Sequence, residues 1–276
     1  MAAPSPPRRT GDRADIEIEL IEGVPVIAAT VNGRGPYRFI VDTGAAGYLV
    51  VKPSLAAALN LRQIGEAMSG DPSGANLRRV PLYNAESVRF GGFTFSGVLT
   101  TAIDLPNPRL ASLDGIVGIR FFQDLLLTID FGRRQLTAAP GSLPAANGRE
   151  IVDVTLDRGA LITLPLRVGR DVHSVHLDTG NSRFPFFMPA DAIAALPTSG
   201  TARSIGAART VSQEIHLQAI DLAAPVSIGT IRLPAVAAVA YPSVAPVGNI
   251  GSQALRNMVV TLDYANRRLR IGPSAG

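Results

Sequence analysis

The sequence predicts a mainly β protein in which one domain occurs twice. Short apolar runs are separated by glycine and polar turns at the spacing of strands. The tripeptide Asp-Thr-Gly follows an apolar run twice, with Asp42 and Asp178 lying 136 positions apart (178 − 42). One copy alone would indicate no more than a turn, because Asp and Gly are common turn residues. Two further segments recur in the same order, which is typical of a duplicated domain.

These segments keep nearly the same offset. VRFGGFTF at 88–95 aligns with VSIGTIRL at 226–233, and the aligned glycines are 138 positions apart (229 − 91). GIVGIRFFQDLLLTIDFGRRQL at 115–136 aligns with GNIGSQALRNMVVTLDYANRRL at 248–269, with glycines 133 positions apart (251 − 118). The Asp-Thr-Gly motif and these two segments therefore recur, while the segments between them differ.

The duplication divides the chain into domains. Residues 138–150 are rich in proline, glycine and small side chains, as linkers are. The N-terminal domain then covers residues 16–137 and the C-terminal domain residues 151–272. Residues 1–15 are rich in proline and arginine and contain no apolar core of a signal peptide, so we expect a disordered leader.

Each copy is expected to contain strands, two short helices and one flexible hairpin. Strands are predicted at 16–22, 25–31, 37–41, 87–90 and 127–130. Helices are predicted at 53–61 and 189–197, where proline lies near the start, and at 120–126 and 253–258. Residues 65–75 have the small, flexible composition of a mobile hairpin, and residues 204–213 occupy the corresponding place in the second copy.

Composition excludes several functions. With 46% apolar residues the chain can bury sizeable cores, but no apolar run reaches the length of a membrane span. The net charge of +4 comes from arginines scattered along the chain, without the basic block or interleaved aromatics of a nucleic-acid site. The absence of cysteine rules out disulfides and thiol chemistry. The compartment stays open between cytoplasm and, if a signal peptide has been removed, periplasm or exterior.

The order of motifs resembles the aspartic proteases, and is most similar to bacterial retropepsin-like proteases. The resemblance rests on apolar-apolar-Asp-Thr-Gly, a flexible hairpin, Asp-Gly-Ile-Val-Gly at 114–118, a helix and a closing strand pair. It covers both halves and implies two β domains, folded as closed barrels and related by a pseudo-twofold axis.

The chemistry implied by this resemblance explains why two copies are needed. Hydrolysis of a peptide bond without metal or covalent nucleophile requires one group that accepts a proton from water and another that donates one to the carbonyl oxygen. Two carboxylates in contact cannot both ionise cheaply, so they share one proton and supply both functions. The resemblance assigns these catalytic roles to Asp42 and Asp178.

Other residues are expected to support the two active loops. By the resemblance, Thr43 and Thr179 bond the opposite loop, Gly44 and Gly180 keep the turns tight, and Gly118 and Gly251 let the chain pass beneath them. Ala45 and Asn181 follow the two motifs, and only Asn181 offers a donor. The flap is expected at the tip of the first hairpin, with candidates Gly70, Asp71, Gly74 and Ala75.

The sequence contains no motif that indicates a different kind of catalytic or metal site. No metal or cofactor site is expected, because His173 and His176 are three positions apart on a predicted strand and point to opposite faces, leaving His216 alone. His176, just before the second motif, is interpreted as a hydrogen-bonded strand histidine, with tuning of the aspartates as the alternative. Asp130 and Asp263 recur, but are interpreted as hairpin residues that pair with arginine.

The sequence therefore predicts an aspartic endopeptidase acting on peptides or proteins. Because one chain contains both halves of the site, we expect a monomer. Two alternatives stay open at this point. One is a catalytically inactive module that binds peptides, and the other is a zymogen whose leader fills the cleft.

Overall fold

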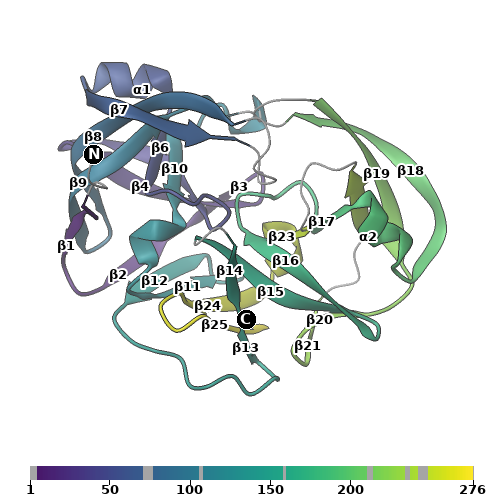
Figure 1. The fold of residues 1–276 in the computed structure, drawn as a ribbon. Helices are drawn as coiled ribbons and strands as arrows, with labels where there is room; N and C mark the ends of the chain where they lie inside the picture. Colours follow the sequence, from purple (N-terminus) through teal and green to yellow (C-terminus); the bar gives the residue numbers. More distant parts are fainter. Residues whose placement is uncertain are drawn as a thin grey trace.

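The computed structural model describes residues 5–70, 77–105, 108–157, 160–209, 214–233, 237–241 and 248–275, and these form a mainly β protein. Three sheets account for its architecture (Figure 1). One sheet comes from the first half of the chain, one from the second half, and one from both. The predicted fold class, mainly β with short helices, is confirmed.

The first sheet has nine strands. In sheet order they are β1 (Arg8–Thr10), β9 (Phe93–Ala102), β6 (Leu49–Val51), β10 (Gly115–Gly118), β5 (Arg34–Asp42), β4 (Val24–Val31), β8 (Arg78–Phe90) and β7 (Arg62–Ser69), with β3 (Glu19–Ile21) paired to β4. An additional pairing of β8 with β9 closes six of these strands, from β9 to β8 in the order given, into a barrel.

The second sheet has ten strands, and the strands around its Asp-Thr-Gly motif follow a similar order. In order they are β18 (Thr198–Arg209), β19 (Glu214–Leu222), β22 (Ala237–Tyr241), β17 (Phe186–Pro189), β23 (Gly248–Gly251), β16 (Asp171–Asp178), β15 (Leu161–Val168), β20 (Val226–Ile228) and β21 (Ile231–Arg232), with β14 (Thr155–Asp157) paired to β15. In both sheets the strand that ends at Asp-Thr-Gly pairs in parallel with a strand of sequence Gly-x-x-Gly.

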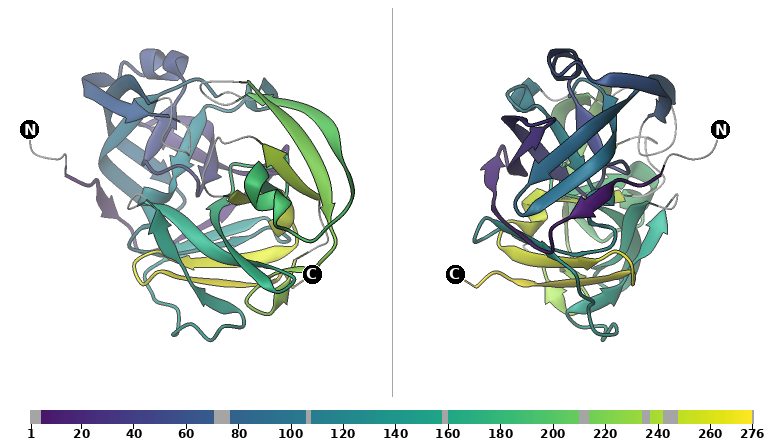
Figure 2. Two further views of the ribbon diagram at one scale, coloured as in Figure 1. Left: turned by 45° about the vertical axis from the view of Figure 1, so that its right-hand side comes forward. Right: turned by 90° about the vertical axis from the view of Figure 1, so that its left-hand side faces the viewer.

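The third sheet joins the two halves. Its six strands are β13 (Ile151–Asp153), β25 (Arg268–Pro273), β24 (Met258–Asp263), β11 (Leu126–Asp130), β12 (Gln135–Ala139) and β2 (Ala14–Glu17). The central pair is β11 with β24, one strand from each half. In Figures 1 and 2 this sheet lies beneath the other two. Buried apolar side chains of all three sheets form one continuous core, which includes Phe39, Leu127 and Ile162.

The predicted disordered leader is wrong for residues 8–15. Strand β1 pairs antiparallel with β9, and β2 pairs with β12 at the edge of the shared sheet. Arg9 anchors β1, because its guanidinium lies 5.1 Å from the centre of the Phe93 ring and 3.1 Å from the Asp124 carboxylate. Backbone pairing and a cation–π contact thus order a segment whose composition favours disorder.

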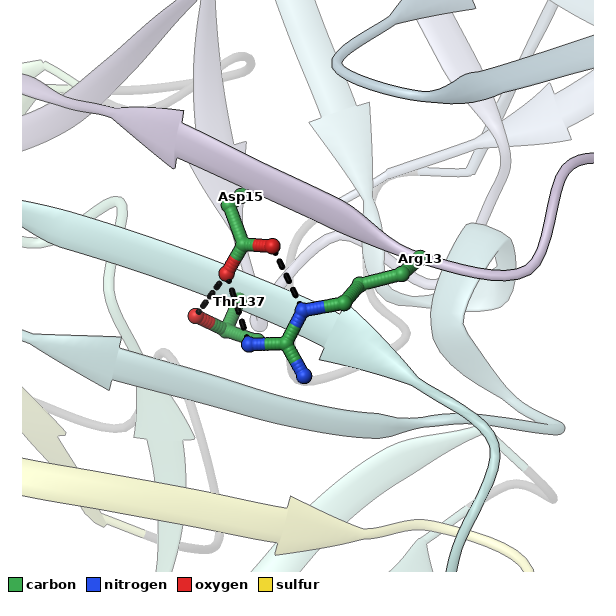
Figure 3. Close-up of polar contacts among 3 residues, drawn as sticks. All are labelled: Arg13, Asp15 and Thr137. Atoms are coloured by element: carbon green, nitrogen blue, oxygen red, sulfur yellow. Dashed lines mark hydrogen bonds and ion pairs between the residues drawn. The ribbon is translucent and has the colours of Figure 1, made fainter.

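Polar contacts also fix β2 at the outer edge of the shared sheet (Figure 3). The Arg13 guanidinium donates two hydrogen bonds to the Asp15 carboxylate, at 2.5 and 2.8 Å, and the Thr137 hydroxyl donates a third at 3.1 Å. These bonds lower the pKa of Asp15. Because the group is exposed, we assign it to edge pairing and give it no larger role in stability.

The helices are shorter than predicted. Helix α1 spans Pro53–Ala58 and α2 spans Ala190–Ala194, within the segments expected to be helical. The other two predicted α-helices are 3₁₀ turns, η2 (Ile119–Phe122) and η3 (Ser252–Leu255), and a further turn, η1, spans Pro108–Leu110. The predicted strand at 16–22 is interrupted at buried Ile18, which separates β2 from β3.

Two long hairpins lie in corresponding places. One is formed by β7 and β8, and the other, at the right of Figure 1, by β18 and β19. Of the flap candidates, Gly70 follows the end of β7, whereas Asp71, Gly74 and Ala75 lie outside the described residues. In the part of the chain that is described, every helix is too short to cross a membrane.

Candidate active site

The two Asp-Thr-Gly motifs occupy equivalent positions at strand ends. Asp42 is the last residue of β5 and lies opposite Gly118 of the parallel strand β10. Asp178 is the last residue of β16 and lies opposite Gly251 of the parallel strand β23. The buried run before each aspartate, apolar apart from His176, holds the strand in the core, so each loop leaves its sheet at the same point.

Reciprocal hydrogen bonds lock the two loops together. The backbone N–H of Thr43 donates to Oγ1 of Thr179, and that of Thr179 donates to Oγ1 of Thr43, both at 3.1 Å. Each hydroxyl then donates across to the opposite strand, Thr43 to the Leu177 carbonyl at 2.8 Å and Thr179 to the Val41 carbonyl at 2.7 Å. Both threonines are buried, so four bonds shielded from water fix the loops relative to each other.

The loop glycines let the two carboxyl groups meet. A Cβ atom on Gly44 would lie 2.8 Å from Cγ of Asp178, and one on Gly180 would lie 2.6 Å from Cγ of Asp42. Each glycine therefore packs directly against the opposite carboxyl group, where no larger residue fits. The two carboxyl groups are close enough to hydrogen-bond each other.

Burial and mutual repulsion keep protons on this pair. Both side chains retain some exposed surface, but protein atoms enclose them closely, and this burial raises the pKa of Asp42 against backbone N–H bonds that lower it. Burial, followed by the negative charge of Asp42, raises the pKa of Asp178 to about 8. The pair therefore titrates as one unit that holds a proton well above the usual range of an aspartate.

Gly118 and Gly251 lie directly beneath the loops. A Cβ atom on Gly118 would lie 2.3 Å from the Gly47 carbonyl oxygen, and one on Gly251 would lie 2.4 Å from that of Asn181. The backbone N–H of each glycine donates to its loop, to Tyr48 at 2.7 Å and to Pro185 at 2.9 Å. The same support thus occurs in both halves.

The halves differ in what surrounds each carboxylate. Oδ1 of Asp42 accepts the Gly44 N–H at 2.8 Å, and Oδ1 of Asp178 accepts the Asn181 N–H at 3.0 Å. Oδ2 of Asp178 also accepts Nδ2 of Asn249 at 3.0 Å, while Oδ1 of Asn249 accepts Nδ2 of Asn181 at 2.8 Å.

Asn249 was not among the residues predicted from the sequence. A signal for it was nevertheless present, since Asn249 aligns with Ile116 of the first copy, a polar residue at an apolar position of the repeat. Ser252 is a second residue that the sequence did not indicate. Its hydroxyl lies 2.8 Å from the Gly23 carbonyl oxygen and 3.2 Å from that of Asn181, and so links the second loop to the first half.

The other titratable residues considered from the sequence lie apart from the pair or serve the fold. His176 is buried, and its Nε2 lies 3.0 Å from Oδ2 of Asp157 in β14. Asp130 accepts the Arg133 backbone N–H and the Ser274 hydroxyl, and Asp263 accepts bonds from Leu143 and Asn266. The expected pairing of these aspartates with arginine side chains is wrong for the described residues, although their hairpin role holds.

In the described ranges, no group of three or more histidine or acidic side chains is arranged to hold a metal ion. The paired loops bring together two carboxyl groups that share a proton in a closely fixed geometry.

Residues 27–121 match the family model described as aspartyl protease. The matched segment includes Asp42 and β10 and ends within η2, whereas Asp178 and the second half of the chain lie outside it. Comparison with curated proteins gives no match. The match supports an aspartic protease family and, at that level, a peptide hydrolase.

Proposed function

We propose that the protein is an endopeptidase that hydrolyses peptide bonds with water activated between Asp42 and Asp178. The observation that carries the proposal is the contact of these two carboxyl groups, fixed by the reciprocal bonds of Thr43 and Thr179. The family match over residues 27–121 supports the same reaction class for the first half.

The steps follow from a pair that holds one proton. The ionised carboxylate accepts a proton from water while the water oxygen attacks the scissile carbonyl carbon, and the protonated carboxyl donates its proton to the carbonyl oxygen. The tetrahedral intermediate then breaks its C–N bond while the proton taken from water passes to the leaving nitrogen. One hydroxyl of the intermediate returns its proton to the other carboxylate, which forms the carboxylic acid product and restores the one-proton pair. Because the loops are fixed in advance, the geometry needs little reorganisation.

The proposal extends to the organisation of the chain. The halves before and after the linker at 138–150 are two equivalent units of a retropepsin-like protease, and each contributes one aspartate. The support lies in matching strand registers, Asp42 opposite Gly118 and Asp178 opposite Gly251. One chain therefore contains a complete site, and the active unit is a monomer acting on a peptide or protein substrate.

The test is cleavage of a diverse peptide library at several pH values by wild type, Asp42→Asn and Asp178→Asn. We expect turnover in the wild type and its loss in both variants, with circular dichroism showing the fold retained. A transition-state mimic with a central hydroxyl should bind the wild type at least about a hundredfold more tightly than either variant.

Substantial activity in either variant would contradict the paired-carboxylate mechanism. Peptide binding without cleavage by the wild type at any pH would instead favour the non-catalytic peptide-binding module.

A further inference from the structure

A chain of two side-chain amides leads to one carboxyl group of the pair. Nδ2 of Asn181 donates to Oδ1 of Asn249, and Nδ2 of Asn249 donates to Oδ2 of Asp178. The first bond fixes which end of the Asn249 amide faces the aspartate, because its oxygen is already used as an acceptor. Asn249 can therefore present only a donor to Asp178.

The corresponding positions of the first half, all of them described, have no counterpart to this pair of amides. The position of Asn249 in β23 corresponds to Ile116 in β10, since Gly251 and Gly118 lie opposite the two aspartates in identical registers. The position of Asn181 corresponds to Ala45. Neither an isoleucine nor an alanine side chain can donate a hydrogen bond, so Oδ2 of Asp42 receives no such amide from these positions.

We propose that Asn249 is a positioning residue of the pair, which holds Oδ2 of Asp178 and makes this carboxyl a stronger acid than burial alone would leave it. This inference rests on the proposed function. Burial favours the neutral form of a carboxyl group, whereas a donated hydrogen bond favours the charged form. A proton donor works best when its pKa lies near the working pH, so the Asn249 bond adjusts Asp178 toward that range.

Few other charged groups act on Asp178. The loops at 43–45 and 179–181, strand β23 and η3 contain no titratable residue apart from the aspartates themselves. Three groups on the neighbouring elements are engaged with other partners. They are His176 bound to Asp157, Arg183 donating to the Ala207 carbonyl, and Arg120 donating to the Ala46 carbonyl.

The test replaces the donor with an apolar side chain of similar size, Asn249→Leu, and measures the pH profile of kcat/KM. Removing the bond destabilises every state in which Asp178 is charged. The sum of the two apparent pKa values that bound the profile should therefore rise by about one to two units. Because Asp178 holds its proton up to about 8, we expect the rise on the alkaline side.

Two further variants distinguish an effect on the acidity of Asp178 from a general effect on packing. Asn181→Ala leaves Asn249 in place but frees its amide to rotate, so the shift should have the same direction and a smaller size. Ile116→Val changes packing at the position that corresponds to Asn249 but removes no hydrogen-bond donor. Its pH profile of kcat/KM should match that of the wild type. A profile that keeps its pKa values in Asn249→Leu while the overall rate falls would overturn the proposal.

A second readout does not require turnover. The free energy of unfolding should fall as pH rises through the folded-state pKa values of the pair, and in Asn249→Leu this fall should extend to higher pH by about one to two units. If the wild type cleaves no peptide but this shift appears, the proposed function fails and the tuning role stands. If the unfolding curves of both proteins fall over the same pH range, the tuning role fails, whatever the activity.

Discussion

Thr128 and Thr261 lie opposite each other in β11 and β24, and their hydroxyl oxygens are 3.0 Å apart. The two residues are 133 positions apart (261 − 128), the same offset that relates Gly118 to Gly251. One residue thus meets its own counterpart at the centre of the shared sheet, as Thr43 meets Thr179 at the loops. Corresponding residues of the two halves therefore contact each other at two separate places.

The threonine bonds between the loops should be important for stability. Thr43→Val keeps the shape of the side chain but leaves the Leu177 carbonyl and the Thr179 N–H without their partner. Two buried groups that lose a hydrogen bond should lower the free energy of unfolding by about 2–4 kcal/mol and reduce turnover. Urea denaturation measures the loss, with Thr43→Ser as control because it retains the hydroxyl. Equal stability of the Val and Ser variants would refute this expectation.

The close approach beneath the second loop should make Gly251 intolerant of substitution. In Gly251→Ala the new Cβ would lie 2.4 Å from the Asn181 carbonyl oxygen and 2.6 Å from that of Phe184, and both are backbone atoms. We expect a loss of about 1–3 kcal/mol in the free energy of unfolding, together with loss of activity. Gly272→Ala is the matched control, because no atom lies within 4 Å of its Cβ position. Thermal denaturation of the two variants side by side would show whether they differ.

Stability should depend on pH through Asp178. Its pKa is raised to about 8 in the folded protein, above the ordinary value of 3.8, so the folded state binds the proton more tightly than the unfolded state. This contribution is complete below about pH 4 and is lost as pH rises through 8. Asp178→Asn should therefore gain stability relative to wild type between these values, as measured by urea unfolding at a series of pH values.

Asp171→Asn provides the comparison for this series, because Asp171 is an exposed carboxylate at the start of the same strand. It controls for the removal of one carboxylate charge away from the pair. A difference between Asp178→Asn and the wild type that does not change with pH would mean that the pair does not hold its proton in the folded protein.

Activity should not depend on protein concentration. The central strand pair β11 and β24 and both Asp-Thr-Gly loops come from one chain, so no second copy is needed to complete the site. Activity per molecule should stay constant on dilution, and sedimentation should show a monomer over the same range. An activity that falls steeply where a dimer dissociates would indicate that halves of different chains pair instead.

The equivalent strands and loops could be predicted because each depends on residues that are adjacent in the sequence and that occur in both halves. Buried strands appear as apolar runs, and turns favour Gly and Asp, so the two motifs and the two Gly-x-x-Gly strands are visible in the sequence. Their meeting across a pseudo-twofold axis is what the resemblance to the aspartic proteases implies. The contacts of Thr43 with Leu177 and of Gly44 with Asp178 agree with what that symmetry requires.

Other features depend on contacts that a sequence pattern does not contain. Strand β1 is ordered by β9, Phe93 and Asp124, all far away in the chain, whereas its own composition favours disorder. The segments predicted as helices at 120–126 and 253–258 are too short to distinguish an α-helix from a 3₁₀ turn by periodicity. In the first of them Phe121 and Phe122 are both buried, a pattern that occurs in short α-helices and in 3₁₀ turns alike.

The joining of both halves in one chain has a consequence for how such a site can evolve. In an assembly of two identical chains every substitution appears on both sides of the axis, so the two carboxyl groups must keep the same neighbours in sequence. Here Ala45 and Ile116 lie on one side, where Asn181 and Asn249 lie on the other. A mutation can therefore be selected for its effect on one aspartate alone, and the two carboxyl groups can acquire different catalytic roles.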